Sequence, residues 1–244
     1  MISYRGFTKD FGDLRAVDGI DLHVAPGEVV ALIGPNGSGK TTTLKALVGL
    51  VRPTSGGITV NGFDATGDGS AARKRLGYLP QRLTFPESVT AREVVRYFAQ
   101  LRRIENVCPV GLLGRVGLAA DAGREVDGFS GGMRQRLGLA LALLGDPAAL
   151  VLDEPSAALD PSGALMVRDI LSDIRRDGTT ILLSSHDLGE VAALADRIAV
   201  FLAGKIVAIG SLPELEAESG CRGIEPVYRA LTSGLRVVPV RSAA

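Results

Sequence analysis

The residues with the clearest chemical pattern lie in one glycine-rich loop. They fit the spacing G-x-x-x-x-G-K-[ST], after an apolar run at residues 29–33 and before a helix-forming stretch at 42–50. Backbone N–H groups of such a loop converge on phosphate oxygens, so the pattern predicts binding of a nucleoside triphosphate. The predicted phosphate-binding residues are Gly34, Pro35, Asn36, Gly37, Ser38, Gly39, Lys40, Thr41 and Thr42.

Each part of this loop has a physical role. Glycine permits backbone angles that other residues avoid, and the helix after the loop directs N–H groups at a bound anion. Lys40 adds positive charge near the terminal phosphates. The Thr41 hydroxyl is an oxygen ligand of the kind that Mg²⁺ prefers. An ordinary glycine-rich turn is the alternative interpretation.

The elements that must position this loop are predicted from apolar periodicity. Short glycine-punctuated apolar segments at 4–30 predict two or three short strands, and later strands and helices alternate. Continuous apolar strands are typical of a parallel sheet covered on both faces, which predicts an α/β fold. The strands are predicted at 29–33, 76–80, 150–152, 180–183, 198–201 and 205–209, and the helices at 42–50, 87–103, from 131 onward, 165–174 and 188–195.

Polar residues follow two buried strands directly, where open α/β sheets bind their ligands. Asp153 and Glu154 follow strand 150–152, and His186 follows the strand that begins at residue 180. Asp153 is predicted to hold Mg²⁺, directly or through water, and Glu154 to act as the general base for an attacking water. Two solvated loop acids and a structural histidine are the alternatives.

Two helices carry more specific expectations. Val94, Tyr97, Phe98 and Leu101 recur at helical spacing and predict the apolar side of an amphipathic helix that covers one face of the domain. Ser130 is the predicted N-cap of the helix that begins near residue 131.

Composition disfavours several classes of protein. Lys and Arg number 27, as do Asp and Glu, and a net charge of zero disfavours binding of nucleic acid. Cys108 and Cys221 are far apart without C-x-x-C spacing, which argues against a disulfide framework and fits a reducing compartment. The first residues lack a signal-peptide core, and charges interrupt the apolar stretch 191–210, so we expect no membrane span.

Residues 129–136, with the sequence F-S-G-G-M-R-Q-R, are similar to the LSGGQ signature of the ATP-binding subunits of ATP-binding-cassette (ABC) transporters. The chain resembles this family from about Tyr4 to about Leu215. The resemblance implies a head-to-tail homodimer with two ATP molecules sandwiched between the chains. The surface that it assigns to the partner's nucleotide is formed by Ser130, Gly131 and Gly132, which the departures Phe129 and Met133 leave intact.

Other positions carry further implications of this resemblance. Phe11 is similar to the aromatic residue that stacks on adenine, although a core phenylalanine is the alternative. Gln81 resembles the glutamine that touches Mg²⁺ and water, where a bare glutamine would suggest a surface residue. The stretch 158–160, ending in Asp160, resembles the loop that crosses the dimer interface. The resemblance also implies that His186 contacts the γ-phosphate.

The implied fold is an α/β P-loop NTPase: a RecA-like core with an N-terminal antiparallel β subdomain and an inserted α-helical subdomain. We expect an ATPase domain at 1–218, with its core at 1–82 and 148–218 and the helical subdomain at 83–147, and a tail at 219–244. The signature variant resembles the subunits of ABC-2 exporters. Residues 76–80 and 133–147 further resemble the copper-processing ATPase of nitrous oxide reductase maturation.

The resemblance implies an Mg²⁺-dependent ATPase that is peripheral on the cytoplasmic side of the membrane and energises a separate transmembrane permease. A cytoplasmic helix of that permease is expected to dock near residues 87–103. A soluble ABC-type assembly factor, such as one that builds iron–sulfur clusters, is the alternative. A small-molecule kinase is disfavoured by the second phosphate-facing surface.

Overall fold

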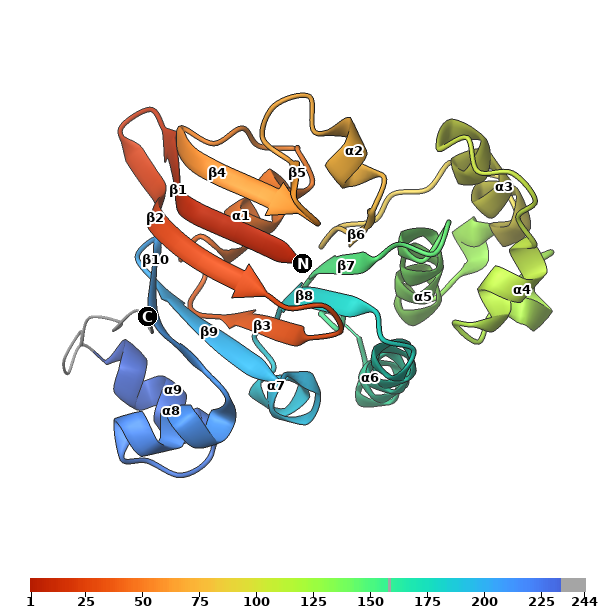
Figure 1. The fold of residues 1–244 in the computed structure, drawn as a ribbon. Coiled ribbons are helices and arrows are strands. Elements are labelled where there is room, and N and C mark those ends of the chain that lie inside the picture. The colour runs from red at the N-terminus through yellow and green to blue at the C-terminus, as the bar shows by residue number, and fades with distance from the viewer. Residues whose placement is uncertain (158, 234–244) are drawn as a thin grey trace.

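Two β-sheets, with helices between and around them, form the structure (Figure 1). The computed structural model describes residues 1–157 and 159–233. An antiparallel sheet has the strand order β2-β1-β4-β5, and a larger sheet has the order β10-β9-β3-β8-β7-β6. The strands are β1 (Ile2–Phe11), β2 (Leu14–Val24), β3 (Val29–Ile33), β4 (Ser55–Val60), β5 (Phe63–Asp64), β6 (Leu76–Leu79), β7 (Ala149–Asp153), β8 (Thr180–Ser184), β9 (Arg197–Leu202) and β10 (Lys205–Gly210).

The larger sheet is parallel except at one edge. β3 pairs in parallel with β8 and β9, β7 pairs in parallel with β6 and β8, and β10 is antiparallel to β9. Along β3, Val29, Ala31 and Ile33 face one hydrophobic core while Val30 and Leu32 face the other. Because both faces are covered, the strands are continuously apolar, as the sequence predicted. The α/β fold is thus confirmed.

Different helices cover the two faces of the larger sheet (Figure 1). α1 packs between the two sheets, whereas α5, α6 and α7 belong to the core on the opposite face of the larger sheet. None of the described helices is long and apolar enough to cross a membrane. The helices are α1 (Lys40–Leu47), α2 (Ser70–Arg73), α3 (Ala91–Leu101), α4 (Pro109–Gly114), α5 (Gly131–Ala142), α6 (Pro161–Arg176), α7 (Leu188–Leu194), α8 (Leu212–Ser219) and α9 (Ile224–Thr232), with 3₁₀ turns η1 (Ala119–Asp121) and η2 (Val126–Gly128).

The N-terminal hairpin is longer than the short strands that the sequence predicted. β1 and β2 span 10 and 11 residues, because the strands continue through shifts of register. One shift lies between Tyr4 and Phe7, where Gly6 has a φ of 54°. Such bulges break the alternation of apolar residues without ending the strand.

The apolar side of α3 differs from the expected one. Tyr97 and Leu101 are 52% and 61% exposed, so the prediction that they mark the buried side is wrong. Phe98 is partly buried, and the fully buried positions are Ala91, Val94, Val95 and Ala99. Small side chains at two of these positions allow the helix to pack closely, and the larger apolar residues beside them are left at the surface.

The last described segment, which lies within the predicted tail, forms a helix. In α9, Val227 is 2% exposed, and the helix packs against α7, α8 and β9. The glycine that precedes it, Gly223, has a φ of 82° and makes the turn from α8. Residues 234–244 of the predicted tail lie outside the described residues.

Candidate active site

The glycine-rich loop joins the end of β3 to the start of α1, as predicted. Gly34 has a φ of 153°, and a Cβ there would collide with the carbonyl oxygen of Phe201. Gly39 has a φ of 108°, and its Cβ would lie 2.6 Å from the carbonyl oxygen of Ala16. No side chain caps α1, so its first N–H groups are available to an anion. The Ser38 hydroxyl, buried in the same loop, has no hydrogen-bond partner among the described residues.

Lys40 lies along the loop that precedes it. Its ammonium nitrogen Nζ donates hydrogen bonds to the carbonyl oxygens of Gly34 (2.8 Å) and Pro35 (3.1 Å). Burial lowers the pKa of Lys40, and the charges of Glu154 and Asp153 act in the opposite direction. The loop thus holds its cation where the phosphate oxygens of a nucleotide would lie.

Asp153 and Thr41 form the expected oxygen pair. Asp153 is completely buried, and its Oδ1 accepts hydrogen bonds from the hydroxyls of Thr41 (3.0 Å) and Ser184 (2.8 Å). Its other oxygen, Oδ2, is buried and has no partner among the described residues. A buried carboxylate with a free oxygen beside a hydroxyl fits the preference of Mg²⁺ for oxygen ligands. Ser184 was not predicted, although its place at the end of a buried strand was a usable signal.

Glu154 and His186 meet directly. Glu154 is 7% exposed, and its Oε2 accepts a hydrogen bond from the His186 N–H (3.2 Å) and lies 2.5 Å from the ring Nδ1. The His186 side chain is 67% exposed, so it covers the carboxylate from the solvent side. The two strand ends therefore bring the predicted base and the predicted histidine into direct hydrogen-bond contact.

The signature residues begin α5, as predicted. The Ser130 hydroxyl accepts a hydrogen bond from the Met133 N–H (3.2 Å), which confirms the N-cap, and both Ser130 and Gly131 are exposed. Phe129 is 4% exposed, with the Arg124 guanidinium carbon 5.7 Å from its ring centre. The aromatic departure from the signature thus lies in the core, next to the exposed Ser130 and Gly131.

A cavity of about 410 Å³ adjoins the signature residues. Asp160, the N-cap of α6, lines it from the other side and accepts a hydrogen bond from the Gly163 N–H (3.0 Å). Ala158, in the loop predicted to cross a dimer interface, lies outside the described residues. Neither the phosphate loop nor Asp153 and Glu154 contributes to the lining of this cavity. The two predicted phosphate-facing surfaces are therefore lined by different residues.

Two predicted residues lie at the surface. Gln81 is exposed on the loop after β6. Phe11 is 49% exposed at the end of β1, with the Lys9 ammonium 4.7 Å from its ring centre. Phe11 is thus not a core residue, and adenine stacking stays a prediction for it.

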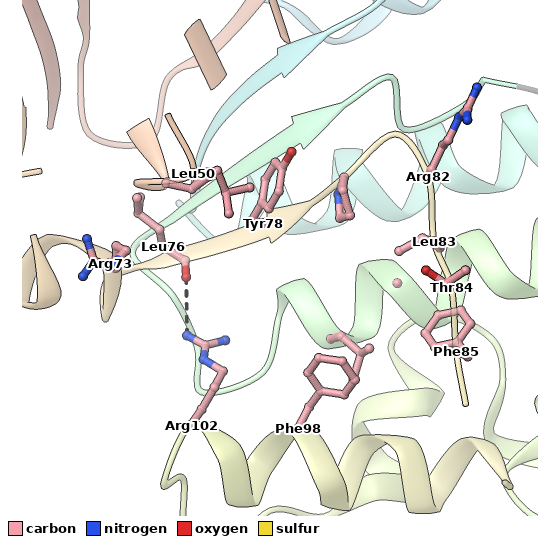
Figure 2. Close-up of a pocket in the computed structure, with 14 residues that line it drawn as sticks. Leu50, Arg73, Leu76, Tyr78, Arg82, Leu83, Thr84, Phe85, Phe98 and Arg102 are labelled. Carbon is pink, nitrogen blue, oxygen red and sulfur yellow. Dashed lines mark hydrogen bonds between the residues drawn. The ribbon is translucent and has the colours of Figure 1, made fainter. Parts of the chain in front are cut away.

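A second cavity, of about 420 Å³, lies between the loop after β6 and helices α3 and α5 (Figure 2). Leu83, Phe85 and Phe98 give it apolar walls, and Arg82 and Arg102 stand at its edges. Arg102 donates hydrogen bonds to the carbonyl oxygens of Leu144 (2.9 Å) and Leu76 (3.4 Å). This groove borders helix 87–103 of the sequence prediction.

Comparisons with known proteins identify the family. Residues 17–157 match the family model described as ABC transporter. The chain is 40% identical over 232 residues to a daunorubicin resistance ATP-binding protein of Streptomyces coeruleorubidus, covering 93% of this chain and 73% of that protein. It is 38% identical to a fluoroquinolones export ATP-binding protein of Mycobacterium tuberculosis, covering 96% and 79%.

Solved structures agree with this result. The ATP-binding subunit of an ABC transporter superposes with a TM-score of 0.85 at 26% identity, covering 95% of this chain and 99% of that one. A bacterial ABC transporter cassette solved as a dimer gives 0.78 at 25% identity, covering 87% and 99%. The chain belongs to the ATP-binding subunits of ABC transporters, and it is an ABC-type ATP hydrolase.

Proposed function

We propose that this ATPase works as a homodimer in which Mg²⁺ and ATP lie between the phosphate loop of one chain and the signature residues of the other. The observation that supports this arrangement most directly is that the cavity at the signature residues is lined by none of the phosphate-loop residues. Ser130 and Gly131 are exposed at the N-terminus of α5, which favours negative charge. The ATP bound to the phosphate loop of a second copy of the chain would place its phosphates against this surface.

Within one such site, Thr41 and Asp153 hold Mg²⁺, and Gln81 completes its surroundings from the loop after β6. Bound Mg²⁺ neutralises charge on the phosphates. Glu154 takes the proton of the attacking water, while His186 turns from Glu154 toward the γ-phosphate and positions that water. Lys40 and the loop N–H groups hold the phosphates, and Phe11 stacks on the adenine.

The hydrolysis cycle energises a separate transmembrane permease, and the chain is peripheral on the cytoplasmic side of the membrane. The groove of Figure 2 supports this proposal, because its apolar walls suit an amphipathic helix of a partner. The relatives named for daunorubicin resistance and fluoroquinolones export support an exporter. ATP binding closes the dimer, hydrolysis opens it, and the permease responds to the two states.

Co-purification of this chain with a transmembrane permease from solubilised membranes tests the proposal. Leu50 lines the groove and is 64% exposed, so Leu50→Glu should leave the fold intact and release the permease. Val110, 49% exposed on α4 away from the groove, supplies the control Val110→Glu, which should keep the permease bound. Retention of the permease by Leu50→Glu would contradict docking in the groove. An active dimer that binds no membrane protein would favour the assembly factor.

A further inference from the structure

Glu154 has a backbone conformation that needs support. Its φ of 55° lies in the left-handed region, which residues with a Cβ seldom adopt. Such a conformation persists only where the surrounding structure holds it, and it is common at functional sites. The contacts on both sides of Glu154 therefore decide where its carboxylate points.

Both flanking peptides are held by hydrogen bonds from distant parts of the chain. On one side, the Glu154 N–H donates to the hydroxyl (3.0 Å) and the carbonyl oxygen (3.2 Å) of Ser184. On the other side, the Pro155 carbonyl oxygen accepts a hydrogen bond from the side-chain amide Nε2 of Gln135, at 2.7 Å. Proline has no N–H, so this carbonyl is the single backbone group through which Pro155 can be held.

Gln135 is a buried polar side chain that the catalytic roles above do not use. It is 8% exposed, and it lies on α5, the helix that begins with the signature residues. A buried amide of this kind is costly unless it is hydrogen-bonded, so its bond to Pro155 fixes the relative position of α5 and the strand end. The signature helix is therefore joined directly to the residue after the predicted base.

The same helix also adjoins the Gln81 loop. At Gly138 a Cβ would lie 2.7 Å from Cδ1 of Leu79, and it would also collide with Leu83. Leu79 and Leu83 lie two positions before and two positions after Gln81, so α5 is in close contact with the chain on both sides of Gln81. A shift of α5 is thus transmitted to the loop after β6 as well as to the segment after β7.

We propose that Gln135 is a positioning residue that couples the signature helix to the orientation of Glu154. The proposal rests on the dimer proposed above. When Ser130 and the glycines beside it bind the nucleotide held by the partner, α5 becomes fixed, and Gln135 fixes Pro155 and the Glu154 carboxylate of its own chain. ATP bound at one site then orients the Glu154 carboxylate of the other site, so the rate of hydrolysis depends cooperatively on the ATP concentration.

Gln135→Met tests the link, because methionine matches the length of glutamine and removes the donor. Since Gln135 contacts no phosphate-binding residue, we expect kcat to fall roughly tenfold, about 1.4 kcal/mol, with KM for ATP unchanged. The Hill coefficient for ATP should fall toward that of independent sites. Gln135→Asn has a side chain shorter by one methylene, so its amide no longer reaches the Pro155 carbonyl oxygen. This variant should give the same result, and it replaces Gln135→Met if the methionine variant does not fold.

Arg175→Met is the control for a merely structural loss. Arg175 joins α6 to the carbonyl oxygen of Leu194 (3.2 Å) and to Asp196, far from the Pro155 contact in the chain, so it should lower stability without changing kcat. If Gln135→Met keeps the wild-type kcat and Hill coefficient while Glu154→Gln is inactive, the coupling through Gln135 is overturned and the role of Glu154 as the base is not. Full turnover by Glu154→Gln would refute the proposed base as well. A raised KM in Gln135→Met would assign Gln135 to nucleotide binding and overturn its positioning role.

Discussion

Ser184→Ala is expected to weaken the site that holds Asp153. The substitution removes the hydroxyl that donates to Asp153 Oδ1 (2.8 Å) and accepts from the Glu154 N–H (3.0 Å). Glu154 keeps its second bond, to the Ser184 carbonyl oxygen at 3.2 Å, so most of the cost comes from Asp153. A hydrogen bond to a buried charged group contributes about 1.5–3 kcal/mol, so the free energy of unfolding should fall by about 2 kcal/mol.

Urea denaturation measures this cost as a lower midpoint at unchanged slope. The matched control is Ser172→Ala, whose hydroxyl donates only to the Arg168 carbonyl oxygen within α6 and should change the free energy of unfolding by less than about 0.5 kcal/mol. The Mg²⁺ concentration for half-maximal ATPase activity should also rise by about tenfold or more, because a residue that orients a metal ligand is lost. Equal stability of the two variants, with unchanged Mg²⁺ dependence, would refute this account of Asp153.

Three further changes test the phosphate loop, the signature surface and a buried carboxylate on α7. Lys40→Ala should weaken ATP binding at least about tenfold by loss of a charge-assisted contact, and unchanged affinity in a titration with labelled ATP would disprove the phosphate-loop role. Ser130→Arg should block the ATP-dependent dimer without changing ATP binding by the monomer, as measured by light scattering; a normal dimer would count against the signature surface. Burial raises the pKa of Glu190 above its ordinary value of 4.5, so the folded state binds that proton more tightly and loses stability as pH rises from 4.5 through the folded pKa. Glu190→Gln removes this loss, so its unfolding free energy relative to wild type should increase across that window in urea titrations; a constant difference would argue against it.

Local sequence signals predicted the parts of the site that depend on neighbouring residues. The loop at 34–41 and the N-cap at Ser130 are set by short-range backbone geometry, and both lie where they were predicted. Asp153, Glu154 and His186 were found because each follows a buried strand, and the ends of parallel strands meet at one edge of the sheet.

Contacts between distant segments were not visible in the sequence. Ser184 meets Asp153 across 31 positions of the chain, and Gln135 meets Pro155 across 20, so no local pattern marks these pairs. Gln135 did carry one signal, since it is a polar residue in line with the apolar positions of α5. The prediction of the buried side of α3 was wrong for a related reason. Packing against neighbouring helices buries Ala91 and Ala99 and leaves Tyr97 exposed, and the periodicity of α3 alone does not show this.

The most direct test of the proposed dimer is light scattering of Glu154→Gln with and without ATP and Mg²⁺. The substitution removes the base but leaves the phosphate loop and the signature surface unchanged, so ATP should stay bound and hold two chains together. The account predicts a shift from monomer to dimer that requires both ATP and Mg²⁺ and that Ser130→Arg abolishes. A variant that binds ATP fully and stays monomeric would contradict the shared nucleotide site.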